Sequence, residues 1–172
     1  MNKIYNKIYP LKPADRDTKI YQKTKELAWV EPQLILNKDY IFDNILPDIL
    51  NEFKQINILK NPFQKLNCIK KIMTYIESLI KFNEGEDKEI GAEDITPVLN
   101  YVFIKAQPLR IFSDIEFTKL FCESSGQFEN SLVNFESICL VIISTSHQNF
   151  NMSLEEYKKR CEDELNKENN NL

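Results

Sequence analysis

The chain has 172 residues, of which 42% are hydrophobic and 28% charged, a balance typical of one globular domain with a buried core. Its net charge of −4 gives no electrostatic support for a nucleic-acid partner. Only three glycines argue against a turn-rich β-sandwich or barrel, and no apolar run approaches the length of a membrane span. We therefore expect a cytoplasmic protein.

The first part of the chain is predicted to precede the core. Residues 1–13 contain two prolines and predict an extended N-terminal arm or one marginal turn. Residues 14–27 are compatible with a polar helix, which should end near Trp29–Pro32, because the residue before a proline is pushed out of the α region. Apolar residues recur at helical spacing over residues 39–59, and Pro47 should kink or split that helix.

Several later stretches predict helices with well-marked starts. Asn61 should cap a helix that begins at Pro62, and a charged loop over residues 81–89 should follow it. One face of this helix is apolar and predicted to be buried, with Phe63, Leu66, Ile69, Ile72, Met73, Ile76, Leu79 and Ile80. Ser-x-x-Glu capping boxes with hydrophobic staples predict two more helix starts, at Ser113 and Ser153.

Residues 134–144 are apolar nearly all round, which predicts a buried helix. A β-strand over Leu140–Ile143 is the alternative, but no second strand is available to pair with it. The Asn-rich residues 166–172 predict a disordered tail. The pattern as a whole predicts an all-α fold, a single layered helical domain of about seven or eight helices. It would span residues 14–165, with a helical lead-in segment before a core that begins at residue 61.

The side chains that most often carry chemistry show no catalytic or metal-binding pattern. The four cysteines are far apart without CxxC spacing, so we expect reduced, partly buried thiols. The single histidine, His147, lies in a polar run, and no motif places an acid or nucleophile beside it. Hydrolase, phosphate-loop and dinucleotide-binding motifs are absent. We therefore expect no metal and no cofactor, and no bond-making or bond-breaking chemistry by conventional side chains.

The stretch over residues 90–121 is the most distinctive in the chain. An acidic pair, Glu93 and Asp94, precedes Pro97 and an apolar helical run, which a Gln107–Pro108 break separates from a second helix. Asp94 fits an N-cap, and this would place Pro97 in the first turn without loss of a hydrogen bond. Glu93 would then be a solvated acid that the helix dipole favours.

Six segments follow one another in a distinctive order: Ala28–Ile35, Asn61–Ile76, Gly91–Pro108, Ser113–Phe121, residues 134–143 and Asn151–Tyr157. Together they resemble the vacuolar-protein-sorting-nine (VPS-nine) domain, the catalytic module of exchange factors for endosomal Rab-five-group GTPases. In the third segment the family typically has a Gly/Ser-Ala-Asp-acid-apolar-apolar-Pro motif and an apolar helix that ends Lys-Ala-Asn-Pro-Pro. The resemblance covers most of the chain and implies the all-α VPS-nine fold.

The resemblance implies a guanine-nucleotide exchange factor that promotes GDP release from an endosomal Rab-type small GTPase and needs no cofactor. Family members are thought to insert an acidic finger into the nucleotide site, where a carboxylate can pair with the P-loop lysine, repel phosphate and disfavour Mg²⁺. Counting back four residues from Pro97 places the finger at Glu93, where the family has Asp. Asp94 is the competing candidate, so these two acids are the candidate catalytic residues.

The family holds the GTPase switch regions in an apolar groove between two helices. The corresponding GTPase-binding candidates here are Pro97, Asn100, Tyr101, Asn130, Val133 and Asn134. The family usually has Tyr at position 130 and Thr at position 133, and commonly an apolar residue at position 100. In an alternative interpretation, Tyr101 is part of the half-buried core.

These departures from the family pattern keep a second hypothesis open. The chain would then be a catalytically weak or inactive VPS-nine-like module that binds a small GTPase or another protein as an adaptor. A third hypothesis is an unrelated helical domain that matches by chance. With no membrane span in the sequence, the resemblance allows peripheral association with endosomal membranes through partners.

Overall fold

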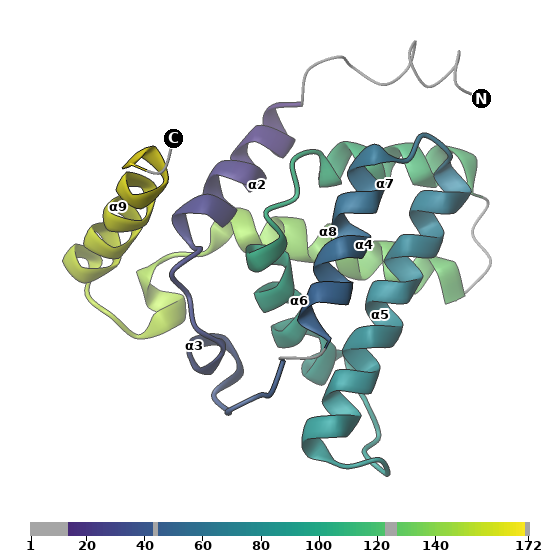
Figure 1. The fold of residues 1–172 in the computed structure, drawn as a ribbon, viewed down its shortest axis with the longest axis horizontal. Coiled ribbons are helices and arrows are strands. Elements are labelled where there is room, and N and C mark those ends of the chain that lie inside the picture. The colour runs from purple at the N-terminus through teal and green to yellow at the C-terminus, as the bar shows by residue number, and fades with distance from the viewer. Residues whose placement is uncertain (1–13, 43–44, 123–126, 171–172) are drawn as a thin grey trace.

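The structure is a computed structural model that describes residues 14–42, 45–122 and 127–170, so the predicted N-terminal arm lies outside the described residues. Over these three ranges the chain forms eight α-helices, one 3₁₀ helix and no strand (Figure 1). In chain order they are α2 (Asp15–Glu26), α3 (Pro32–Leu36), α4 (Leu46–Ile58), α5 (Pro62–Glu84), α6 (Ala92–Ala106), α7 (Ile111–Phe121), α8 (Gln127–Ser144), η1 (His147–Phe150) and α9 (Leu154–Asn170). The predicted all-α fold is confirmed, and the strand alternative over Leu140–Ile143 is wrong, because α8 contains those residues.

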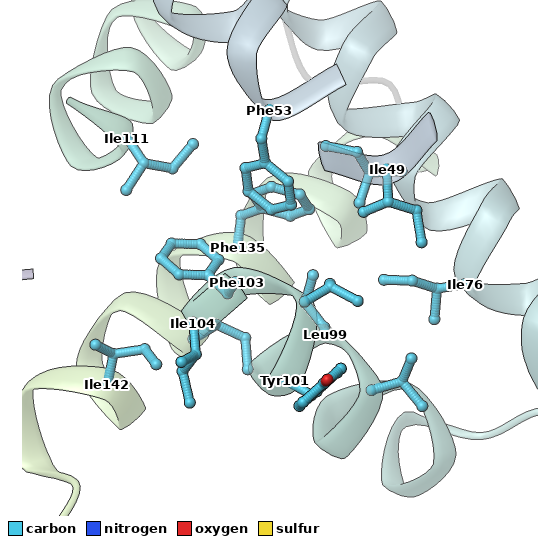
Figure 2. Packing of buried hydrophobic residues seen from close by; sticks show 14 of the residues in the cluster. Ile49, Phe53, Ile76, Leu99, Tyr101, Phe103, Ile104, Ile111, Phe135 and Ile142 are labelled. Atoms are coloured by element: carbon cyan, nitrogen blue, oxygen red, sulfur yellow. The ribbon is translucent and has the colours of Figure 1, made fainter. Parts of the chain in front are cut away.

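Helix α6 lies at the centre of the fold. It packs against α2, α3, α4, α5 and α8, while α4, α5 and α7 pack against one another beside it (Figure 1). The Phe103 ring of α6 lies 5.5 Å from Phe53 of α4 and 6.3 Å from Phe135 of α8, measured between ring centroids (Figure 2). Each fully buried apolar side chain contributes about 1.5–3 kcal/mol. The core therefore fixes the C-terminal two-thirds of α6 and leaves its first turn at the surface.

Helices α4 and α5 start where proline costs no hydrogen bond. The predicted helix over residues 39–59 is shorter in the structure, because α4 begins at Leu46, and Pro47 therefore lies in the first turn and causes no kink. Helix α5 begins as predicted, with the Phe63 N–H donating to Asn61 Oδ1 at 2.9 Å. It continues to Glu84, however, so part of the predicted charged loop is helical.

The predicted buried face of α5 is confirmed except at its first member. Phe63 is 51% exposed, whereas the other seven residues of the face are buried. Phe63 lies six residues before Ile69, which places it about 120° round the helix from the centre of that face. The prediction that Phe63 is buried rested on its apolar character alone and is wrong, because its position on the helix faces solvent.

Helix α7 is capped by another helix and not by its own sequence. The predicted capping box at Ser113 is wrong, because α7 begins at Ile111 and Ser113 lies within the first turn. The Ser113 N–H donates to Asp17 Oδ1 of α2 at 3.1 Å, and the Ser113 hydroxyl donates to Asp17 Oδ2. Asp17 is fully buried and also accepts from the Ala14 N–H at 3.2 Å. At Ser153 the serine half of the predicted box is present, since the Glu156 N–H donates to Ser153 Oγ at 3.1 Å, while the Glu156 carboxylate accepts from Arg160.

Replacing Asp17 by Ala should lower the free energy of unfolding by about 1–3 kcal/mol, because it removes a buried carboxylate that accepts from partly buried N–H and O–H donors at two helix starts. Urea unfolding of the two proteins measures the difference. Asp15→Ala is the matched control, since Asp15 is an exposed acid in the same turn of α2. Equal losses in the two variants would contradict the capping role of Asp17.

The C-terminal part differs from prediction in two places. Helix α8 is confirmed, but Leu140 and Ile143 are exposed, because the neighbouring helices cover only the face with Phe135, Ile138 and Ile142. Helix α9 extends to Asn170, so residues 166–170 are helical and not a disordered tail. All four cysteines are buried and free, in agreement with the prediction. Within the described ranges, no helix combines the length and the apolar character needed to span a bilayer.

Candidate functional site

The acidic pair lies in the first turn of α6. The helix begins at Ala92 with Gly91 as its N-cap, so Asp94 is the third helical residue and not the N-cap. Asp94 still caps the helix, because its Oδ2 accepts from the Gly91 N–H at 2.9 Å. Pro97 is the sixth helical residue, beyond the predicted first turn. Since proline has no N–H, the helix loses the hydrogen bond that residue 97 would make to the Glu93 carbonyl.

Both carboxylate oxygens of Asp94 are engaged within the domain. While Oδ2 accepts from Gly91, Oδ1 lies 2.9 Å from Lys88 Nζ in the loop before α6. The Gly91 amide, and after it the Lys88 ammonium, hold the pKa of Asp94 below its ordinary value. Asp94 is therefore ionised at neutral pH and occupied by local partners.

Glu93 differs from its neighbour in both exposure and contacts. Its side chain is exposed, and its carboxylate lies over Gly91, where an added Cβ would be only 2.4 Å from Glu93 Oε2. No hydrogen bond or ion pair joins that carboxylate to any residue that the structure describes. Glu93 is thus the acid of the pair that is free to meet a partner.

A groove with a volume of about 610 Å³ opens beside this turn, between α5, α6 and α8. Gly91, Ala92 and Ile95 line it from α6, and three predicted GTPase-binding residues, Asn130, Val133 and Asn134, line it from α8. Val133 is 47% exposed, so an apolar surface is available next to the acidic pair. The structure therefore brings half of the predicted binding residues together with Glu93.

The other three predicted binding residues lie away from this groove. Pro97 and Asn100 line a second pocket, of about 430 Å³, that α3 and the end of α8 complete. Tyr101 is buried, with its ring centroid 4.7 Å from that of Phe42. The Lys105 ammonium lies 5.4 Å from the Tyr101 ring on the same helix. The geometry favours a core role for Tyr101 over direct contact with a partner.

Two lysines that hold α6 in place were not predicted. Lys88 anchors the first turn, as described above, and Lys105 Nζ donates to the Ala28 carbonyl at 2.7 Å, which joins the last turn of α6 to the turn that follows α2. Lys105 belongs to the Lys-Ala-Gln-Pro segment that resembles the family motif, so the sequence could have indicated that it has a role. Lys88 lies in a charged loop whose sequence gives no such signal. Among the described residues, no group of three or more His, Cys, Asp or Glu side chains is arranged to hold a metal ion.

The chain matches one protein-family model. Residues 46–155, more than half of the chain, match the Vacuolar sorting protein 9 (VPS9) domain. This match includes α4 to α8 and therefore every residue of the groove and of the acidic pair.

Individual relatives are 26–31% identical to this chain over the aligned residues. It is 26% identical to the Rab5 GDP/GTP exchange factor of Homo sapiens over 171 residues, which cover 92% of this chain and 34% of that protein. It is 29% identical over 138 residues to the GTPase-activating protein and VPS9 domain-containing protein 1 of Bos taurus, with coverage of 76% and 10%. It is 31% identical over 94 residues to the Receptor-mediated endocytosis protein 6 of Caenorhabditis elegans, with coverage of 53% and 8%. The chain thus spans a minor part of each relative.

Proposed function

The chain belongs to the VPS9 domain family, and from this membership we propose that it is a guanine-nucleotide exchange factor for a Rab-type small GTPase. The name of the human relative, a Rab5 GDP/GTP exchange factor, supports this activity. That name and the endocytic name of the Caenorhabditis elegans relative point to a GTPase of the endosomal Rab group as the partner. Association with endosomal membranes would then come through partners.

An exchange factor acts by binding free energy and needs no nucleophile. It must bind the nucleotide-free GTPase far better than the nucleotide-bound form, so that factor and nucleotide weaken each other's binding by the same ratio. A carboxylate placed in the nucleotide site serves this purpose, because it pairs with the P-loop lysine and repels the phosphates and disfavours Mg²⁺. The domain therefore needs one acid that is ionised, exposed and rigidly carried.

The free carboxylate of Glu93 is the observation that carries the proposal. It lies on the first turn of a helix whose remainder is fixed in the core, next to a groove with exposed apolar surface. Asp94, one residue further on, is held by Gly91 and Lys88. Glu93 is therefore the proposed finger. Its extra methylene gives it a longer reach and a less rigid aim than the aspartate of the family.

The groove between α6 and α8 is the proposed docking surface for the switch regions. Ile95 and Val133 supply apolar contact, while Asn130 and Asn134 offer amides to a GTPase backbone. The position of Glu93 beside this groove would allow the switch regions and the nucleotide site to be engaged together.

The adaptor hypothesis rests on specific residues. Asn130 and Val133 replace the family's Tyr and Thr on the α8 side of the groove, and the finger is Glu instead of Asp. An adaptor would bind a GTPase through the same groove without a large preference for the empty form.

Release of a fluorescent GDP analogue from a panel of Rab-type GTPases, Rab5 among them, tests the proposed function. We expect the domain to accelerate release from at least one endosomal member and to leave unrelated Rab proteins unaffected. Binding without acceleration would favour the adaptor hypothesis. Neither binding nor acceleration across the endosomal members would overturn the proposal.

A further inference from the structure

The loop between α5 and α6 ends in an ionic anchor at the start of the finger helix. We propose that Lys88 is a positioning residue for nucleotide exchange: it holds the Asp94 carboxylate at the first turn of α6 and so sets the direction of the free Glu93. This inference rests on the proposed exchange function and names a residue outside the family motif. Lys88 acts through Asp94 and touches neither the nucleotide nor the GTPase.

The contacts of Lys88 join the end of one helix to the start of the next. Its Nζ lies 2.9 Å from Asp94 Oδ1 and 3.6 Å from Glu84 Oε2, the last residue of α5. The Lys88 side chain is 31% exposed, that of Glu84 16% and that of Asp94 12%. These ions are partly shielded from water, so their attraction is less screened than that of a fully exposed pair.

A second set of contacts fixes Glu84 in turn. Glu84 Oε1 accepts from the Tyr40 hydroxyl and from Lys38 Nζ, the latter at 2.9 Å. One residue earlier, Asn83 Oδ1 accepts from the Ile41 N–H at 2.8 Å. These contacts join the segment before α4 to the end of α5. Lys88 then joins the end of α5 to the start of α6.

The first turn of α6 needs such an anchor for two reasons. Pro97 removes a backbone hydrogen bond from the turn that follows it, and Ala92, Glu93 and Thr96 are exposed, so Ile95 is the one residue of positions 92–96 that packs against the core. The loop before it also turns at Gly85, which has a φ of 114°, and glycine has no Cβ and therefore restricts the backbone less than other residues. Without Lys88 the first turn would sample several orientations, and Glu93 with it.

Lys88 also keeps the two acids of the pair distinct. If Lys88 were absent, Asp94 Oδ2 would still accept from the Gly91 N–H, but Oδ1 would lose its cation and become available one residue from Glu93. It would compete for the P-loop lysine from a position that does not suit the nucleotide site. The anchor thus affects which acid acts as well as how well it is aimed.

The test measures GDP release as a function of domain concentration and separates kcat from the KM for the GTPase. We expect Lys88→Met to lower kcat at least about tenfold, since small misplacements of a reacting group have effects of this size or larger. KM should change less than kcat, because Asn130, Val133 and Asn134 of α8 still line the groove, and the melting temperature should change little, because the core is untouched. Lys88→Arg should restore most of kcat. Lys81→Met, which removes a lysine from the last turn of α5, is the control for net charge.

A double-mutant cycle with Asp94→Asn separates positioning from a general structural role. The amide oxygen of Asn can still accept from the Gly91 N–H, but the ionic partner of Lys88 is gone. We expect Asp94→Asn to lower kcat to a similar extent and the double variant to be no slower than either single variant. Additive losses, or full activity of Lys88→Met beside an active wild type, would overturn this inference alone. A wild-type domain that fails to accelerate release from any member of the panel would overturn the proposed function and this inference together.

Discussion

Glu93→Ala should slow the proposed exchange reaction, measured as GDP release, by about 100-fold, a loss typical of removing one preorganised electrostatic group from a site that excludes water. The expected size follows from the free state of the Glu93 carboxylate. Nothing inside the described domain depends on it, so its removal should act on exchange and leave folding unchanged. The measurement is the rate of fluorescent GDP release at saturating domain concentration, with the melting temperature of each protein recorded alongside.

Two matched variants decide what such a loss means. Glu86→Ala removes the same charge from the exposed loop before α6 and should leave the rate unchanged. Glu93→Asp keeps the charge and shortens the side chain by one methylene, so a rate above wild type would show that the glutamate has weakened exchange in this chain. Full activity of Glu93→Ala together with loss in Asp94→Ala would contradict the assignment and move the finger to Asp94.

Lys65→Ala should lower the free energy of unfolding by about 3–5 kcal/mol, the usual cost of breaking a buried ion pair from one side. Lys65 is fully buried, with its Nζ 2.6 Å from Asp114 Oδ1 of α7 and 2.5 Å from the Ile56 carbonyl of α4. Burial lowers the pKa of Lys65, and the Asp114 carboxylate opposes that shift. The truncation leaves a buried carboxylate without this cation, and urea unfolding measures the effect.

Lys71, on the same helix as Lys65, is the control because its ammonium is exposed to water. Its Nζ lies 3.0 Å from Glu52 Oε1 of α4, and the Lys71 side chain is 60% exposed, whereas that of Glu52 is 9% exposed. Water keeps access to this pair from the lysine side, so Lys71→Ala should cost about 1 kcal/mol, less than Lys65→Ala. If Lys65→Ala lowered the free energy of unfolding as little as Lys71→Ala does, Lys65 would not stabilise the contacts between α4, α5 and α7 as described.

Helical periodicity and local capping signals predicted most of the fold. The Asn61 cap of α5 and the Ser153 cap of α9 are local features, and both are present in the structure. The error at α7 has one physical cause. Its cap is Asp17 of α2, which is 96 residues away in the sequence. A local sequence pattern cannot predict a hydrogen-bond acceptor that comes from another helix.

The sequence located the acidic pair but did not divide the roles within it. Whether Glu93 or Asp94 is free depends on where α6 begins and on Lys88, and both are known only from the structure. Tyr101 shows a similar limit. Helix α6 is packed by neighbours on several sides, so apolar spacing did not indicate that Tyr101 faces the core while Pro97 and Asn100 face a pocket.

Two lysines in the matched segments have structural roles in this chain. From α5, Lys65 binds Asp114 of α7 and the Ile56 carbonyl of α4 in the interior, and Lys105 joins the end of α6 to the turn that follows α2. Both hold α6 or its neighbours in place and contribute nothing to the groove. The likeness of sequence to the family therefore reflects the scaffold as well as the site.

The most direct test of the account is the affinity of the wild-type domain for one endosomal Rab-type GTPase, measured in its nucleotide-free and its GDP-loaded forms. The exchange mechanism predicts that the nucleotide-free form binds at least about 100-fold more tightly, because factor and nucleotide must weaken each other's binding by the same ratio. Equal affinity for the two forms would contradict the account and identify the domain as an adaptor that binds its GTPase without discharging it.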